Sequence, residues 1–235
     1  MIRTATLISA LTLAACQQEA QAPAARPEPA IQPPVAGVPP PAPPATNTPA
    51  EPTPEPQASD DWRDYAKPAD VERLKQLDAA WETALASARK AGHEKYLAEL
   101  DGLADPKTRA LANPHPAPGN YRCRTVKIGG LGVISYPWFR CRIELTPGGD
   151  LTYTKLTGSQ RGEGKFYPSG ESERRLVYLG GQAWGLDPTI SATDYGDDPQ
   201  RDQIGVLERI GDQRWRLALP LPRVESELDI IELAK

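Results

Sequence analysis

The chain has 235 residues, with 27 Lys and Arg against 31 Asp and Glu, and a formal net charge of −4. Its length allows one or two domains. From residue 61 onward the charges nearly cancel, whereas a domain that binds nucleic acid is usually clearly basic. The composition therefore argues against nucleic acid as a partner.

The N-terminus has the pattern of a bacterial secretory signal. A basic start at residues 1–3 precedes an apolar stretch over about 4–13, which is far too short to span a bilayer as a helix. The stretch ends in Leu-Ala-Ala-Cys at 13–16, which resembles the lipobox of bacterial lipoproteins. That resemblance implies a signal peptide at 1–15, palmitate or another fatty acid on Cys16, and a membrane anchor.

Residues 16–60 are rich in Pro and Ala, contain no aromatic residue and have few large aliphatic ones. Such a segment cannot offset its ordering entropy by apolar burial, so we expect a disordered linker with polyproline II character. At about 3.1 Å per residue it could reach on the order of 100 Å from a membrane. It is either a semi-rigid stalk or a linker whose exact sequence hardly matters. Gln17 is not the Asp that marks inner-membrane retention in well-studied lipoproteins, so the resemblance implies the outer membrane, facing the periplasm.

Two cysteines remain once Cys16 is assigned to the lipobox. Cys123 and Cys141 form an even pair in a compartment expected to be oxidising, which predicts a disulfide worth about 3 kcal/mol. A two-Cys metal site would need further thiolates or His nearby, but His93 and His115 lie in another segment. We expect neither a metal nor a cofactor.

A single α+β domain is predicted over residues 61–235. Apolar residues recur at helical spacing from Pro68 to Ala91, and a second helix is expected from about His93 to Leu103. This helical part, 61–113, resembles a hairpin too small to stand alone, so it should pack against the β-rich part at 118–235.

From residue 118 the apolar pattern changes to a period of two, which is typical of half-buried strands. Several short strands at regular spacing indicate an antiparallel meander, closed or nearly closed as a small barrel. Strands are expected at 121–126, 139–145, 151–156, 164–167, 174–179, 205–210 and 215–219, and near 228–233.

Several short strings of residues, specific only in combination, resemble the DUF4893 domain family. They lie at 118–124, 156–161, 195–196 with 201–202, 208–211, 214–217 with Pro220, and 225–229. The family consists of exported bacterial proteins of unknown function. The resemblance therefore implies export and a domain from Trp62 to the C-terminus, and it offers no catalytic residue.

Four arginines flank the cysteines. If Cys123 and Cys141 point into the sheet, their neighbours point outward on adjacent strands. Four guanidinium groups on one face could bind a phosphate or carboxylate, such as a lipid head group or a wall stem peptide. Alternatively they pair with Glu144, Glu163, Glu208 or other carboxylates across the sheet. These arginines are Arg122, Arg124, Arg140 and Arg142.

The polar segment 156–165 could form a rim loop that presents Ser159, Gln160 and Arg161 to a ligand. It lacks the Walker A pattern, so a tight turn or bulge between strands is the other interpretation. The acidic stretch 194–202 does not match an EF-hand and is expected to be an ordered loop held by arginine.

No arrangement of Ser or Cys with His is apparent, and no spacing singles out a pair of carboxylates. We therefore expect a non-catalytic binding or accessory role in the cell envelope. The partner would be an anionic envelope component or another envelope protein. The alternative is a hydrolase acting on an envelope polymer. Buried carboxylates clustered in a cleft would favour the enzyme. An apolar cavity inside the barrel would favour a small-ligand binder, and a filled barrel would favour a protein-interaction module.

Overall fold

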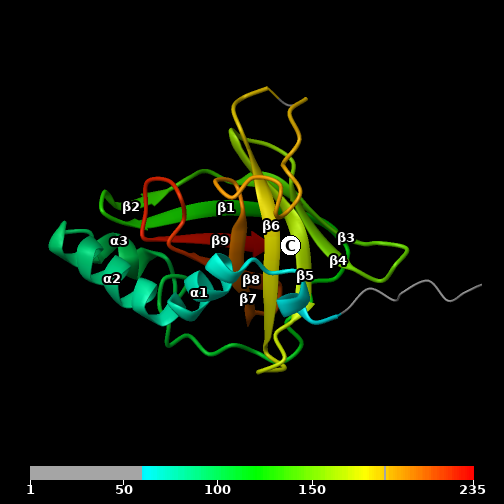
Figure 1. The fold of residues 1–235 in the computed structure, drawn as a ribbon. Coiled ribbons are helices and arrows are strands. Elements are labelled where there is room, and N and C mark those ends of the chain that lie inside the picture. Colours follow the sequence, from blue (N-terminus) through cyan, green and yellow to red (C-terminus); the bar gives the residue numbers. More distant parts are fainter. Residues whose placement is uncertain (1–59, 188) are drawn as a thin grey trace, which may run out of the picture. The chain divides into compact units, whose positions relative to one another are not determined.

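The computed structural model describes residues 60–187 and 189–235 (Figure 1). The predicted signal peptide at 1–15, the lipidation site Cys16 and all of the predicted linker except Asp60 lie outside these residues. The described residues therefore cover the predicted domain at 61–235, apart from residue 188.

The described residues form nine antiparallel strands, of which eight run around a closed barrel. β1 pairs with β3 along one edge and with β9 along the other, so eight strands close the barrel and β2 extends the sheet beside β1. The predicted barrel-like meander is confirmed. The strands are β1 (Gly119–Gly129), β2 (Gly132–Ser135), β3 (Phe139–Leu145), β4 (Leu151–Lys155), β5 (Gln160–Pro168), β6 (Arg175–Trp184), β7 (Gln203–Gly211), β8 (Arg214–Pro220) and β9 (Leu228–Ala234).

Side chains at alternate positions of each strand fill one half of the barrel interior with an apolar core. Cys123 and Cys141 lie in this core and form the predicted disulfide, with their Cα atoms 5.9 Å apart. They sit diagonally, because Cys123 lies opposite Phe139 and Cys141 lies opposite Tyr121. The other core residues include Ile143, Tyr153, Phe166, Leu176, Tyr178, Leu207, Trp215, Leu217, Ile231 and Leu233.

The chain between β2 and β3 forms a bulge that the sequence pattern does not reveal. Cys123 lies opposite Phe139 and Val126 lies opposite Ser135, so two residues of β1 face the three residues 136–138. Pro137 stands within this insertion, where a proline does not interrupt a strand ladder. The bulge places Trp138 on the outside of the barrel.

The helices cover one side of the barrel (Figure 1). They are the short 3-10 turn η1 (Trp62–Asp64), α1 (Pro68–Lys75), α2 (Leu77–Lys90) and α3 (Glu94–Glu99). The single helix predicted from Pro68 to Ala91 is interrupted at Gln76, whose φ of −88° and ψ of 7° leave the helical region. The break lets α1 pack on β6 and β7 while α2 packs on β1 and β9. The second predicted helix is shorter than expected.

Candidate functional site

Arg122 of β1 and Arg140 of β3 lie directly opposite each other on the outer face of the barrel. Both side chains are exposed, as the alternation around the two inward cysteines predicted. Neither makes an ion pair with any residue in the described part of the chain. Two positive charges therefore stand side by side on a rigid sheet without a carboxylate between them.

Trp138 lies among these arginines and is 39% exposed. The guanidinium carbons of Arg122 and Arg124 lie 5.0 and 4.9 Å from the centre of its ring, which is within cation–π distance. The indole thus helps to orient both guanidinium groups. We call the outward side chains of Arg122, Arg124, Arg140, Arg142 and Trp138 the arginine surface.

The other two arginines of this surface have carboxylate partners. The Nε of Arg124 donates to Glu232 at 2.5 Å, in a contact that is largely buried on the glutamate side. Arg142 lies 3.6 Å from Glu144, and both side chains are about half exposed, so this pair is weak. The pairing alternative therefore holds for Arg124 and Arg142, and anion binding by Arg122 and Arg140 stays a prediction.

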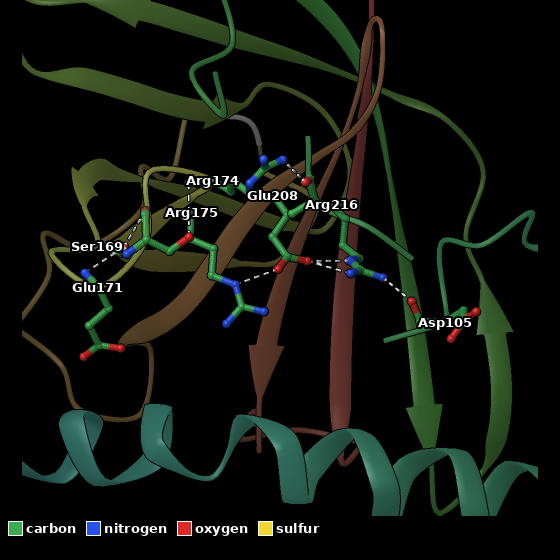
Figure 2. Close-up of polar contacts among 9 residues, drawn as sticks. Asp105, Ser169, Glu171, Arg174, Arg175, Glu208 and Arg216 are labelled. Atoms are coloured by element: carbon green, nitrogen blue, oxygen red, sulfur yellow. Dashed lines mark hydrogen bonds and ion pairs between the residues drawn. The ribbon is translucent and has the colours of Figure 1, made fainter. Parts of the chain in front are cut away.

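Glu208, one of the carboxylates suggested as a partner, is instead bound by two other arginines (Figure 2). Arg175 Nε donates to one carboxylate oxygen at 2.8 Å, and Arg216 Nη2 donates to the other at 2.6 Å. Arg216, which is only 2% exposed, also donates to the carbonyl of Asp105 at 2.7 Å. This network ties the segment after α3 to the barrel and has a structural role.

A second polar cluster in Figure 2 closes the turn before β6. The hydroxyl of Ser169 accepts the backbone N–H groups of Glu171 and Ser172, and it donates to the carbonyl of Ser172. Arg174 reaches away from this turn and donates to the carbonyl of Ala110 at 2.9 Å. These contacts order the turn before β6 and attach it to the segment around Ala110.

The three residues predicted for a rim loop point in different directions. Ser159 is exposed in the turn, Gln160 begins β5 and faces the barrel interior, and Arg161 faces outward but is buried. Arg161 serves as a loop anchor, because its guanidinium donates to four carbonyl oxygens at 2.6–3.0 Å. Those carbonyls belong to Gly158, Gly185, Asp187 and Ile190.

The acidic stretch 194–202 forms an ordered loop, which is the arrangement the sequence favoured. Arg201 Nε lies 3.2 Å from Asp198, and Asp202 accepts the backbone N–H of Gly196 at 2.8 Å. Within residues 60–187 and 189–235, no three His, Cys, Asp or Glu side chains are grouped as a metal site would require.

The half of the barrel interior opposite the apolar core is polar, and sequence reasoning missed it. We call it the polar end. Lys127 and Asp229 are buried there and form an ion pair at 3.0 Å. Burial raises the pKa of Asp229, while the nearby Lys127 opposes that shift. The sequence does contain a sign of the polar end, because Lys127 and Lys155 stand at strand positions whose side chains point into the barrel. The side chains of the polar end are Thr125, Lys127, Lys155, Gln160, Gln182, Gln203 and Asp229.

Lys155 differs from Lys127 because no carboxylate within the described residues lies at ion-pair distance from its ammonium group. The residue is 6% exposed, and its Nζ lies 4.4 Å from the centre of the Phe139 ring. Burial, followed by repulsion from Lys127, lowers the pKa of Lys155 to about 8. Perturbed titratable groups that line a cavity are typical of functional sites.

The barrel is filled at both ends. The polar end contains an inner cavity of about 10 Å³ and a mouth cavity of about 20 Å³, each large enough for about one water molecule. Neither could take an acyl chain or a haem. A filled barrel favours interaction through the outer surface over a ligand held inside an apolar cavity.

One comparison with known proteins identifies the family, and none adds an activity. The sequence model of one family, described as a domain of unknown function (DUF4893), matches residues 62–233. This confirms the resemblance seen in the sequence and its extent. No curated protein and no solved structure matches the chain. None of the helices among the described residues is both long and apolar enough to cross a membrane.

Proposed function

The chain belongs to the DUF4893 family, and we propose that it is a lipid-anchored envelope protein that binds an anionic envelope component through its arginine surface. The role is non-catalytic. The observation that carries the proposal is the cross-strand pair of Arg122 and Arg140, two exposed guanidinium groups without a carboxylate partner among the described residues.

The chemistry of this surface suits a phosphate or carboxylate. Each guanidinium has a planar fork of N–H donors that matches the oxygens of such anions, and two forks on neighbouring strands can act together. Trp138 adds an exposed aromatic edge, which suits the boundary between a charged head group and an apolar region. The sheet fixes the backbone positions of Arg122 and Arg140, and Trp138 orients the Arg122 guanidinium, which lowers the ordering cost of binding.

The anchor rests on the lipobox resemblance at 13–16. A lipid on Cys16 would be inserted in the outer membrane, and the Pro-rich segment 17–60 would tether the domain to it on the periplasmic side. Replacing Cys16 with Ser should abolish palmitate labelling and release the protein from membranes. Palmitate labelling that persists in the Cys16→Ser protein would refute the anchor without bearing on the arginine surface.

The binding proposal is tested with vesicles that contain either neutral lipid alone or neutral lipid with phosphatidylglycerol or lipid A. The protein from residue 17 onward should sediment with the anionic vesicles. The double variant Arg122→Ala, Arg140→Ala should bind at least ten-fold more weakly. A matched control, Arg109→Ala with Lys90→Ala, removes the same charge from exposed positions elsewhere and should bind as the parent does. Equal losses in both variants would reduce the effect to net charge and reject the proposal.

A hydrolase is the second candidate, because buried Asp202 and Asp229 line the same mouth cavity and burial raises the pKa of both. A cavity of about 20 Å³ does not admit a polymer segment, and Asp229 already binds Lys127. Release of fragments from peptidoglycan by the parent protein, lost in Asp202→Asn, would favour the enzyme over the binding role.

A further inference from the structure

The polar end of the barrel has two buried ammonium groups and one buried carboxylate. Asp229 uses one oxygen to accept from Lys127 at 3.0 Å and the other to accept from the hydroxyl of Ser226. Lys155 therefore shares this carboxylate only at longer range. Its close partner is the face of Phe139. An isolated buried charge is strongly unfavourable unless something compensates it.

The inner cavity that Lys155 lines offers polar groups for a further partner. Gln160, Gln182 and Gln203 line it with carboxamides, and Thr125 adds a hydroxyl. The side-chain oxygen of Gln182 accepts from the indole N–H of Trp184 at 2.8 Å, which leaves the side-chain NH₂ of Gln182 for other contacts. Gln203 is buried, and its side-chain oxygen has no hydrogen-bond donor within the described chain. A carboxamide turned by 180° would direct its two donors into the same space.

We propose that the polar end binds one small monovalent anion, of the size of chloride, with Lys155 as its cationic contact. The carboxamides of Gln160, Gln182 and Gln203 supply the hydrogen-bond donors. The site lies inside the barrel and is separate from the arginine surface, so this inference does not rest on the proposed function.

The size of the anion follows from the space available. An inner cavity of about 10 Å³ accommodates about one water-sized group, which excludes sulfate, phosphate and larger carboxylates. Entry would be through the mouth cavity, whose lining has more cationic side chains than carboxylates. The cations are Arg73, Lys127, Arg201 and Arg223, and the carboxylates are Asp202 and Asp229. These charges favour an anion over a cation at the entrance.

The experiment uses the full chain purified in a non-ionic detergent and compares bromide, as the probe anion, with sulfate at matched ionic strength. Bromide at roughly ten times its dissociation constant should raise the melting temperature by about 4 °C in a saturable way. Sulfate, which is excluded from protein surfaces, should give only a non-saturating shift that grows with its concentration. Lys155→Met should lose the bromide effect. Lys165→Met, which removes a half-exposed lysine on the neighbouring strand, should keep it.

Two outcomes would overturn the inference. Either sulfate also gives a saturable rise in melting temperature, or Lys155→Met responds to bromide as the parent does. Should Lys155→Met fail to fold, crystals of the parent protein soaked in bromide decide the matter. The inference requires an anomalous peak in the inner cavity beside the Lys155 ammonium, and a peak confined to the outer surface would contradict it. The double variant Arg122→Ala, Arg140→Ala should retain the full bromide effect, which separates this test from that of the arginine surface.

Discussion

The arginines on the helix-covered side of the barrel differ from those of the arginine surface in the residues that lie opposite them. Glu208 lies opposite Arg175 on one neighbouring strand and opposite Arg216 on the other. Arg122 has Arg140 opposite it on one side and Ala234 on the other. Directly opposed residues are the main unit of side-chain pairing in a sheet, so register decides much of which arginines become structural. Arg214 is an exception, because it lies opposite Ala234 and reaches Glu232 diagonally. The arginines left unpaired are available for another partner.

The largest expected effect is at Arg216, which is buried against Glu208 and donates to carbonyls of the segment after α3. Arg216→Ala should lower the free energy of unfolding by about 3–5 kcal/mol, because it breaks a buried ion pair and leaves those acceptors unsatisfied. Urea denaturation checks this, with Arg109→Ala, exposed in a loop, as a control that stays within about 0.5 kcal/mol of the parent. A loss below about 1 kcal/mol in Arg216→Ala would show that the network is not structural.

The disulfide holds β1 to β3, the two strands that carry the arginine surface. Changing Cys123 and Cys141 together to Ala should cost about 3 kcal/mol, since the bridge closes a loop with a sequence separation of 18. The same measurement on the reduced parent should give a similar loss. If the double variant were as stable as the oxidised parent, the bridge would contribute nothing to the sheet.

Lys155 is a third kind of cation, buried and without an acid opposite it. Its folded pKa of about 8 lies below its unfolded value near 10.5. Between these pH values the unfolded chain therefore binds more protons than the folded chain. Burial of the charged lysine lowers the free energy of unfolding by its full amount below pH 8, and this loss disappears as the pH rises to about 10.5. In sulfate buffer, Lys155→Met should be about 1–3 kcal/mol more stable than the parent at pH 7 and similar to it near pH 10.5. A pH-independent difference would contradict the assigned burial cost.

The smallest expected effect tests the like-charge pair itself. Arg140→Glu replaces a repulsive cross-strand pair with an attractive one, so the variant should gain about 0.2–1 kcal/mol in unfolding free energy. The same change should abolish binding to anionic vesicles. A variant that is destabilised would show that Arg140 already has a stabilising role in the fold.

Much of the fold follows from the period-two pattern, and the rest depends on tertiary contacts. The alternation of apolar residues predicts strand β3 with its observed bounds, and the inward cysteines follow from the same alternation. The helix break at Gln76 is not predictable in this way, because local propensity favours a continuous helix while packing against two parts of the barrel divides it. β2 escapes the pattern because it is short and precedes a proline.

The candidate sites divide in the same way. The outward direction of the four arginines is predictable from strand parity, but their partners depend on a register that the sequence does not specify. The outward Trp138 depends on the bulge before β3. The polar end could have been predicted from Lys155, which is two residues from the buried Tyr153 on β4 and so points to the same side of the sheet. Only closure of the barrel shows that Lys155 lacks a carboxylate partner.

The most direct test is a nuclear magnetic resonance spectrum of the arginine Nε–H groups, recorded with and without short-chain phosphatidylglycerol. The Nε atoms of four arginines donate to Glu208 or Glu232, so their signals should be protected from exchange. Those of Arg175, Arg214 and Arg216, which lie outside the arginine surface, should also be unaffected by the lipid. Without lipid, the Nε–H protons of Arg122 and Arg140 should exchange rapidly with water. On lipid addition their signals should shift and become protected from exchange. If those two signals stayed unchanged while others moved, the arginine surface would not be the binding site. The four protected arginines are Arg124, Arg175, Arg214 and Arg216.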